Sequence, residues 1–151
     1  NKFKFLVRGP SDSSISKSKN NLLIKNFKLK SSFNLDFEEG FIQNSEFFKT
    51  IDIFLFPSKR EGFGSVALEA QACGLPVICS DIYGLHSSVI DGYGGIYCDN
   101  IKQYKNALLK LLDKTIYKRY CKNAFTFSLN YSEDIFSNKL LKLYQSIISI
   151  D

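Results

Sequence analysis

The fold is decided by residues 52–78, which read DIFLFPSKREGFGSVALEAQACGLPVI. Residues 53–56 form a continuous apolar run, as expected of a parallel strand covered on both faces. A break at Pro57 and a glycine loop follow, and then residues 66–73 have a helical pattern. Residues 77–79 return to an apolar strand. This order predicts a parallel α/β sheet, in which ligands bind at the carboxyl ends of the strands.

The remaining segments extend the same alternation. Residues 2–8 predict a strand, and a second, weak strand lies at residues 22–27 or at residues 33–37. The pattern leaves both alternatives open. The other predicted elements are an exposed loop at 11–21, short helices at 43–49 and near 85–90, a turn at 91–95, a strand at 96–98, and helices from 101, over 118–127 and after Ser132. We therefore predict an α/β fold with a Rossmann-like, doubly wound parallel sheet and a helical C-terminal tail.

Composition sets broad limits on partners. With 151 residues and 44% hydrophobic content, the chain can bury one modest core, which predicts a single domain over residues 1–151. The formal charge of +5 favours anionic partners, whether sugar nucleotides, anionic lipid or nucleic acid. No aromatic-basic recognition motif is present, so we expect no nucleic-acid partner. No apolar window approaches the roughly 18 residues of a membrane span, which predicts a cytoplasmic protein or one peripheral to a membrane.

The four cysteines do not suggest metal binding. They are Cys73, Cys79, Cys98 and Cys121, and none is paired in a CxxC motif or placed beside histidines. We expect reduced thiols and no metal site.

The glycine loop has the chemistry of a ligand site. Gly62 and Gly64 flank Phe63, so the backbone can approach a ligand closely. The N-terminus of the following helix favours an oxygen-rich or phosphorylated group. Glu61 can meet hydroxyls or developing positive charge on a sugar, and Glu69 can accept hydrogen bonds from a vicinal diol such as a ribose. The alternative from spacing alone is an ordinary strand-to-helix turn with Glu69 solvated.

The surrounding sequence narrows this choice. Residues 52–99 contain two glutamates separated by seven residues, preceded by Pro-Ser and followed by Glu-Ala and Gly-Leu-Pro-Val-Ile. This segment resembles the C-terminal, nucleotide-sugar-binding domain of GT-B retaining glycosyltransferases of family 4 (group 1). Residues 60–66 and 80–84 are most similar to the capsular, O-antigen and other surface-polysaccharide enzymes.

The resemblance implies a function and a site. It implies transfer of a sugar from a nucleotide sugar, expected to be a UDP-sugar, to a glycan or lipid-linked acceptor in bacterial surface polysaccharide biosynthesis. Glu61 would act on the donor sugar in catalysis, and Glu69 would bind the ribose. The implied donor-binding residues are Glu61, Gly62, Phe63, Gly64, Ser65 and Glu69. Such enzymes retain anomeric configuration, and we expect no cofactor and no metal.

The chain departs from the family at its start. Family members carry an N-terminal acceptor domain, then a first strand and helix with a basic pair that binds the donor diphosphate. We expect these parts to be missing here, and little or no transfer by this chain without an acceptor domain or partner subunit. Two alternatives are a non-catalytic sugar-nucleotide-binding subunit and a GT-B-fold UDP-hexosamine epimerase. The Pro-Ser…Glu…Glu-Ala pattern disfavours the epimerase because it is the transferase form.

Two other features leave alternatives open. His86, the one histidine, is either a solvated loop residue or a group near the donor. The lysines and arginine over residues 102–122 form either a solvated face or a surface that attracts anionic lipid on the inner face of a membrane.

Overall fold

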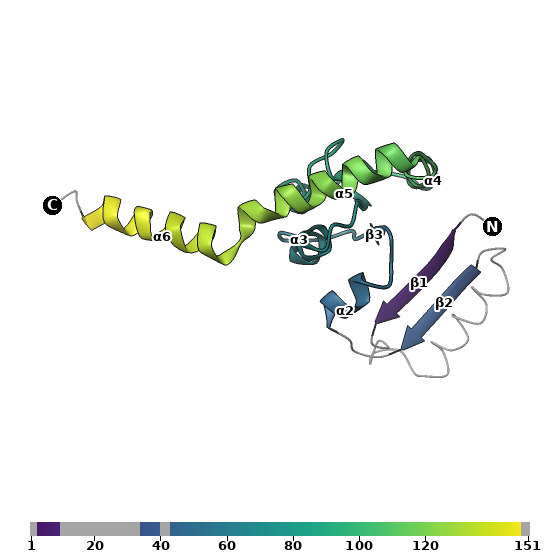
Figure 1. Ribbon diagram of the computed structural model, residues 1–151, viewed down its shortest axis with the longest axis horizontal. Coiled ribbons are helices and arrows are strands. Elements are labelled where there is room, and N and C mark those ends of the chain that lie inside the picture. The colour runs from purple at the N-terminus through teal and green to yellow at the C-terminus, as the bar shows by residue number, and fades with distance from the viewer. Residues whose placement is uncertain (1–2, 10–33, 40–42, 149–151) are drawn as a thin grey trace. The chain divides into compact units, whose positions relative to one another are not determined.

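The structure is a computed structural model that describes residues 3–9, 34–39 and 43–148. Its elements group into two units, Asn1–Gln43 and Asn44–Asp151. Each unit contains its own parallel sheet, and the two-stranded one can be followed in Figure 1. The prediction that residues 1–151 form a single domain stays a prediction.

The first unit contains two strands. Strand β1 spans Lys4–Gly9 and pairs in parallel with β2, Asn34–Glu39. The predicted first strand is thereby confirmed, and so is the second of the two alternatives for the next strand. The other alternative, at residues 22–27, and the predicted loop at 11–21 lie outside the described residues.

The second unit contains a three-stranded parallel sheet. Strands β3 (Phe54–Phe56), β4 (Val77–Ser80) and β5 (Gly95–Cys98) are ordered β3-β4-β5. Val77 of β4 is paired with Phe54 on one side and Gly95 on the other. All three strands were predicted, and each lies within two residues of its expected start.

Helices cover both faces of this sheet. On one face Val77 and Cys79 pack with residues of α2 (Asn44–Phe48) and α3 (Ser65–Ala72). On the other face Ile78 packs with residues of α4 (Ile101–Lys110) and α5 (Lys114–Ser128). Side chains alternate between the faces of a strand, so a sheet covered on both sides needs a continuous apolar run. The predicted doubly wound α/β fold is confirmed.

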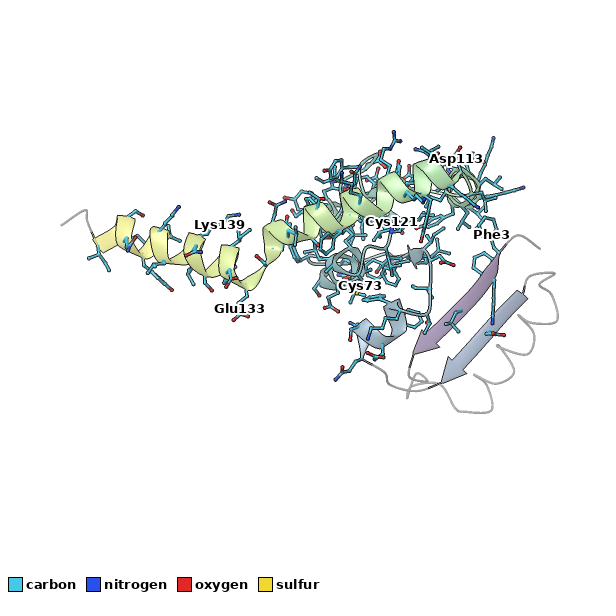
Figure 2. The ribbon with its side chains drawn as sticks, in the orientation of Figure 1. Phe3, Cys73, Asp113, Cys121, Glu133 and Lys139 are labelled. Atoms are coloured by element: carbon cyan, nitrogen blue, oxygen red, sulfur yellow. The ribbon has the colours of Figure 1, made fainter. Side chains whose placement is uncertain are left out.

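The helix boundaries depend on local caps. Asn100 accepts a hydrogen bond from the Gln103 amide at the start of α4. The Asp113 carboxylate accepts hydrogen bonds from the amides of Thr115 and Ile116, so α5 begins at Lys114, one turn before the predicted start at 118. Figure 2 shows Asp113 at this end of α5.

The prediction of a short helix near residues 85–90 is wrong. A 3-10 turn, η1 (Tyr83–Leu85), is followed there by irregular turns. Ser88 explains the difference, because its carbonyl accepts a hydrogen bond from the buried Gln71 side chain at 2.6 Å. Its hydroxyl donates to the carbonyl of Leu85 at 3.3 Å. The Gln71 bond holds the segment against α3, and its backbone makes single turns in which the amides of Ser88 and Val89 donate to the Leu85 carbonyl.

The chain ends in a helix with an exposed apolar stripe. A 3-10 turn, η2 (Leu129–Tyr131), joins α5 to α6, Glu133–Ile148 (Figure 1). No residue of α6 is buried within the described part of the chain. Its exposed large apolar side chains are Phe136, Leu141, Leu143, Tyr144, Ile147 and Ile148. The predicted helical tail is therefore confirmed. None of the helices described is long and apolar enough to cross a bilayer.

Candidate functional site

The glycine loop connects the carboxyl end of β3 to the first turn of α3. Gly64 is the N-cap residue of α3 and has a left-handed backbone, with φ of +75°. A side chain there would be strained and would also overlap Leu85, with Ser88 Oγ only 3.0 Å away. The helix has no side-chain cap and no acidic residue in its first turn. Its N-terminal amide groups are therefore suited to hold an anionic ligand.

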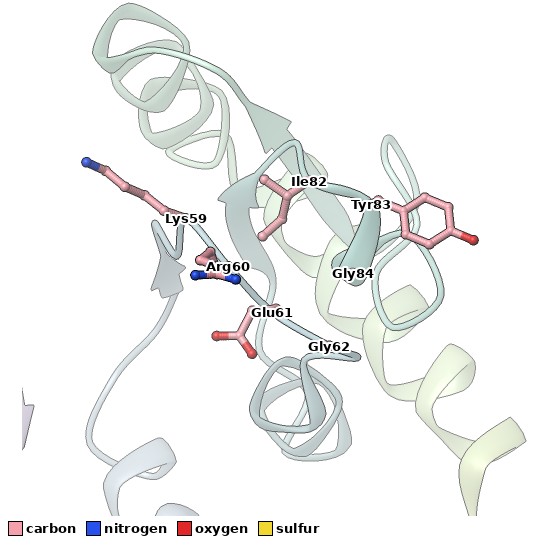
Figure 3. Close-up of a pocket in the computed structure, with 7 residues that line it drawn as sticks. All are labelled: Lys59, Arg60, Glu61, Gly62, Ile82, Tyr83 and Gly84. Carbon is pink, nitrogen blue, oxygen red and sulfur yellow. The ribbon is translucent and has the colours of Figure 1, made fainter.

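A pocket of about 510 Å³ opens beside this loop. Two segments line it, one after β3 and one after β4. The lining residues are Lys59, Arg60, Glu61, Gly62, Ile82, Tyr83 and Gly84 (Figure 3). The pocket thus lies at the carboxyl ends of adjacent parallel strands, where open α/β sheets bind ligands.

Glu61 and Gly62 are the predicted site residues that line the pocket. Glu61 is half-buried, and within the described residues its carboxylate has no hydrogen-bond or ion-pair partner. Figure 3 shows Lys59 and Tyr83 directed away from this carboxylate. A free carboxylate beside an exposed glycine backbone can accept hydrogen bonds from ligand hydroxyls.

The other predicted residues do not line this pocket. Glu69 is exposed on α3, where Oε2 accepts a hydrogen bond of 2.6 Å from Asn44 Nδ2 at the start of α2. Gly64 is buried and Ser65 is exposed at the first turn of α3. Phe63 is turned toward η2, with its ring centroid 5.8 Å from that of Tyr131. The structure therefore brings two of the six residues into the pocket and places the other four along the loop and α3.

The sequence interpretation missed the second wall of the pocket. Residues 82–84 follow β4 as the glycine loop follows β3, so the rule on carboxyl ends of strands was the available signal. Gly84 lies so close to the loop that an added Cβ would overlap the Glu61 carbonyl. The close approach of these two backbones fixes the separation of the two walls.

His86 lies on this second segment but does not line the pocket. Its Nε2 is 2.7 Å from Oδ1 of Asp81, and its ring stacks on Tyr97 with centroids 5.1 Å apart. His86 is exposed, as the alternative of a solvated loop residue predicts, and Asp81 and Tyr97 also contact its ring.

The thiols beneath the site are not suited to act as nucleophiles. Cys79 and Cys98 are buried on β4 and β5. Burial raises the pKa of Cys79 to about 12 and that of Cys98 to about 11. Because the thiolate is the reactive form, both groups remain inert near neutral pH.

Comparison with known proteins identifies the family. The model of the family described as glycosyl transferases group 1 matches residues 2–126. The chain belongs to this family. This membership confirms the predicted resemblance to group 1 glycosyltransferases, and the named relatives confirm that the family is one of glycosyltransferases.

Two curated relatives give the sequence similarity. The chain is 35% identical over 106 residues to the Campylobacter jejuni N,N'-diacetylbacillosaminyl-diphospho-undecaprenol alpha-1,3-N-acetylgalactosaminyltransferase, covering 68% of this chain and 28% of the relative. It is 31% identical over 106 residues to the Acidothermus cellulolyticus D-inositol 3-phosphate glycosyltransferase, covering 69% of this chain and 24% of that relative. The group 1 chain therefore spans about a quarter of these relatives.

Solved structures share the fold. The Anabaena protein HepE in complex with UDP and glucose superposes with a TM-score of 0.78 at 17% identity, over 95% of this chain and 40% of that one. The C-terminal domain of a Francisella tularensis glycosyl transferase group 1 protein superposes with a TM-score of 0.69 at 23% identity, over 86% and 70%. These likenesses support the GT-B assignment of the group 1 chain.

Proposed function

We propose that this chain forms the donor site of a retaining, metal-independent glycosyltransferase that uses a UDP-sugar. The observation that carries the proposal is the pocket at the carboxyl ends of β3 and β4, where the free Glu61 carboxylate adjoins a glycine backbone and an uncapped helix N-terminus. A hexose offers hydroxyls to a carboxylate, and a diphosphate offers anionic oxygens to backbone amides. HepE, which shares this fold, has been solved in complex with UDP and glucose and with UDP-glucose.

Each part of the donor is assigned to named groups. Glu61 accepts hydrogen bonds from the donor sugar and stabilises positive charge that develops at the anomeric carbon. The backbone of Gly62, Phe63 and Gly64, with the first turn of α3 at Ser65, faces sugar and phosphate oxygens. Glu69 accepts hydrogen bonds from the ribose hydroxyls, and Asn44 orients the Glu69 carboxylate through the 2.6 Å hydrogen bond.

The proposed reaction needs no protein base. The bond between the anomeric carbon and the UDP oxygen breaks as the acceptor hydroxyl attacks from the same face. The leaving phosphate oxygen takes the proton of that hydroxyl, and the new glycosidic bond keeps the configuration of the donor. The residues of this chain bind and orient the donor and stabilise the charge that forms.

The relatives support a proposal for the acceptor and the cellular setting. The Campylobacter relative is named for a diphospho-undecaprenol acceptor, and this supports a glycan or lipid-linked acceptor in the synthesis of a bacterial surface polysaccharide such as capsule or lipopolysaccharide. An enzyme with such an acceptor would work in the cytoplasm, peripherally on the inner face of the membrane. The basic residues of α4 and α5 suit an anionic lipid surface.

A second candidate function is that of a sugar-nucleotide-binding subunit. One solved neighbour is a GtfA/B complex, with a TM-score of 0.76 over 95% of this chain. By analogy, this chain would bind the donor while an acceptor domain or partner subunit completes the enzyme. Transfer from UDP-glucose only when a separate acceptor-domain protein is added to this chain would support this candidate.

Calorimetric titration of the chain with UDP-glucose tests the proposal. We expect Glu69→Ala to weaken binding roughly 10- to 100-fold, since a hydrogen bond to a charged group is lost. Glu69→Ala should weaken the binding of UDP alone as much as it weakens the binding of UDP-glucose. Glu61→Gln should weaken the binding of UDP-glucose more than that of UDP, because Glu61 is assigned to the sugar. Glu133→Gln, at the exposed first turn of α6, is the matched control and should bind as the wild type does. Equal binding by all four proteins, or none by the wild type, would contradict the proposal.

A further inference from the structure

The junction between α5 and α6 contacts one residue that directly follows the first pocket wall and one that lies just beyond the second. Tyr131, the last residue of η2, places its ring 5.8 Å from that of Phe63 in the glycine loop. The Tyr131 hydroxyl donates a hydrogen bond of 2.5 Å to the carbonyl of Ser87, which follows the second wall. One side chain therefore joins two loops that are far apart in the sequence.

The Tyr131 contacts lie outside the hydrophobic core. Phe63 is 42% exposed and Tyr131 is 43% exposed, and neither belongs to the two core clusters. Helix α5 is anchored separately by the buried Tyr120 and Ala124. A half-exposed ring pair contributes little to folding through burial, because much of its apolar surface remains in water. Its effect should therefore be local to the loops that it touches.

The glycine loop has few other restraints at Phe63. Gly62 is exposed, and an added Cβ there would meet nothing within 4 Å. Gly64 has the left-handed backbone that glycine favours. Phe63 is the one large side chain between these two glycines, so its packing determines how the backbone on either side is presented. The ring of Tyr131 is itself held by Phe127 of α5, with centroids 5.4 Å apart.

The second wall is held from two directions. The Ser88 carbonyl is bound to α3 through Gln71, and the adjacent Ser87 carbonyl is bound to Tyr131. Both carbonyls lie a few residues after Gly84, which contacts the backbone of Glu61. A shift of residues 86–88 would therefore be passed to the pocket.

We propose that Tyr131 is a positioning residue for the donor pocket, holding Phe63 with its ring and Ser87 with its hydroxyl. This inference rests on the proposed donor site. It assigns a role in that site to the start of the helical tail, because Tyr131 directly precedes Ser132, where the chain turns into α6.

Two variants separate the two contacts. Tyr131→Phe keeps the ring and removes the hydrogen bond to Ser87, whereas Tyr131→Leu removes both contacts. Phe125→Leu is the matched control, since Phe125 is 48% exposed on α5 and has no ring partner among the described residues. Hydrogen exchange of the ligand-free protein is measured first, at residues 61–65, at residues 86–88 and in β4.

We expect Tyr131→Leu to speed exchange about tenfold in both loops, which corresponds to about 1.4 kcal/mol, and to leave β4 unchanged. Tyr131→Phe should speed exchange at residues 86–88 alone. Unchanged loops in Tyr131→Leu, or equal acceleration in β4, would overturn the inference, since the second result indicates general loss of stability. Phe125→Leu should exchange at the wild-type rate in both loops. Faster loop exchange in this variant would also overturn the inference.

Affinity for UDP-glucose provides a second readout. We expect Tyr131→Leu to weaken binding roughly tenfold and Tyr131→Phe to weaken it less. In a cycle with Phe63→Leu, the two leucine substitutions together should weaken binding by less than the product of their separate effects. If the double variant weakens binding by the full product of the two separate effects, Tyr131 does not act through Phe63. If the wild type fails to bind UDP-glucose while exchange changes as expected, the proposed donor is wrong and the positioning role stands.

Discussion

The α-carbon of Gly84 lies against the carbonyl group of Glu61, so closely that a methyl group on Gly84 would overlap the Glu61 oxygen. The contact joins the loop after β4 to the loop after β3. Backbone atoms on both sides make it unable to relax through a side-chain rotation. The separation of the two pocket walls is therefore set by the absence of a side chain at position 84.

Gly84→Ala should consequently disturb both stability and the site. We expect a loss of roughly 1–3 kcal/mol in the free energy of unfolding, as for overpacking at other crowded positions. Gly62→Ala is the matched variant, because an added methyl there meets nothing within 4 Å. Urea unfolding of the two proteins tests the prediction, and equal stability would show that the Glu61 loop gives way freely.

The hydrogen bond from Asn44 Nδ2 to Glu69 Oε2 provides a second prediction. Asn44→Asp removes the donor and places a like charge beside Glu69, so the Glu69 carboxylate should turn away from its position. We expect binding of UDP-glucose to weaken roughly tenfold and the effect to shrink with added salt. Asn106→Asp, on the exposed face of α4, adds the same charge elsewhere and controls for net charge. A similar loss in both variants would point to net charge instead.

The buried Gln71 side chain predicts a variant whose stability depends on pH. Its amide nitrogen donates to the carbonyls of Ser88 and Ala67, at 2.6 and 3.1 Å, in a fully buried position. In Gln71→Glu a carboxylate could not donate, and burial would raise its pKa in the folded state above that in the unfolded chain. The protonated form can still donate one hydrogen bond, so the variant should be closer to wild type in mild acid and lose stability as pH rises.

Unfolding measured from pH 4 to pH 8 tests this sign. Gln71→Leu, which cannot titrate, serves as the reference and should be destabilised by roughly 1–3 kcal/mol at every pH, because the Ser88 carbonyl loses its partner. If the stability of Gln71→Glu does not change with pH, the segment around Ser88 must move to let the carboxylate reach water.

The buried thiols predict instability at high pH. Burial raises the pKa of Cys79 from 9.0 to about 12, so the unfolded chain loses this proton first as pH increases. The stabilisation is complete below pH 9 and is lost between pH 9 and about 12. We expect the free energy of unfolding to fall over that range in the wild type and less steeply in Cys79→Ala. Cys73→Ala changes an exposed thiol and should keep the wild-type slope.

Local sequence patterns were sufficient for the elements of the second unit and insufficient for one connection. The runs before and after the glycine loop predicted β3, α3 and β4, because a strand covered on both faces needs consecutive apolar residues. Residues 85–90 were misassigned because their backbone is held by Gln71, a residue 17 positions away. A pattern over neighbouring residues carries no information about that partner.

The sequence by itself determined the α/β fold, the strand-loop-helix unit and the identity of Glu61 and Glu69 as the site's candidate carboxylates. The fold and the strand-loop-helix unit depend on side-chain periodicity and on glycine's conformational freedom, which are local properties. The two glutamates were singled out by the resemblance to group 1 glycosyltransferases. Only the tertiary structure decided that Glu61 faces a pocket closed by residues 82–84, that Asn44 holds Glu69, and that Tyr131 contacts Phe63 and Ser87. Those contacts depend on strand register and on how the helices pack over the sheet, which bring together residues that no local pattern relates.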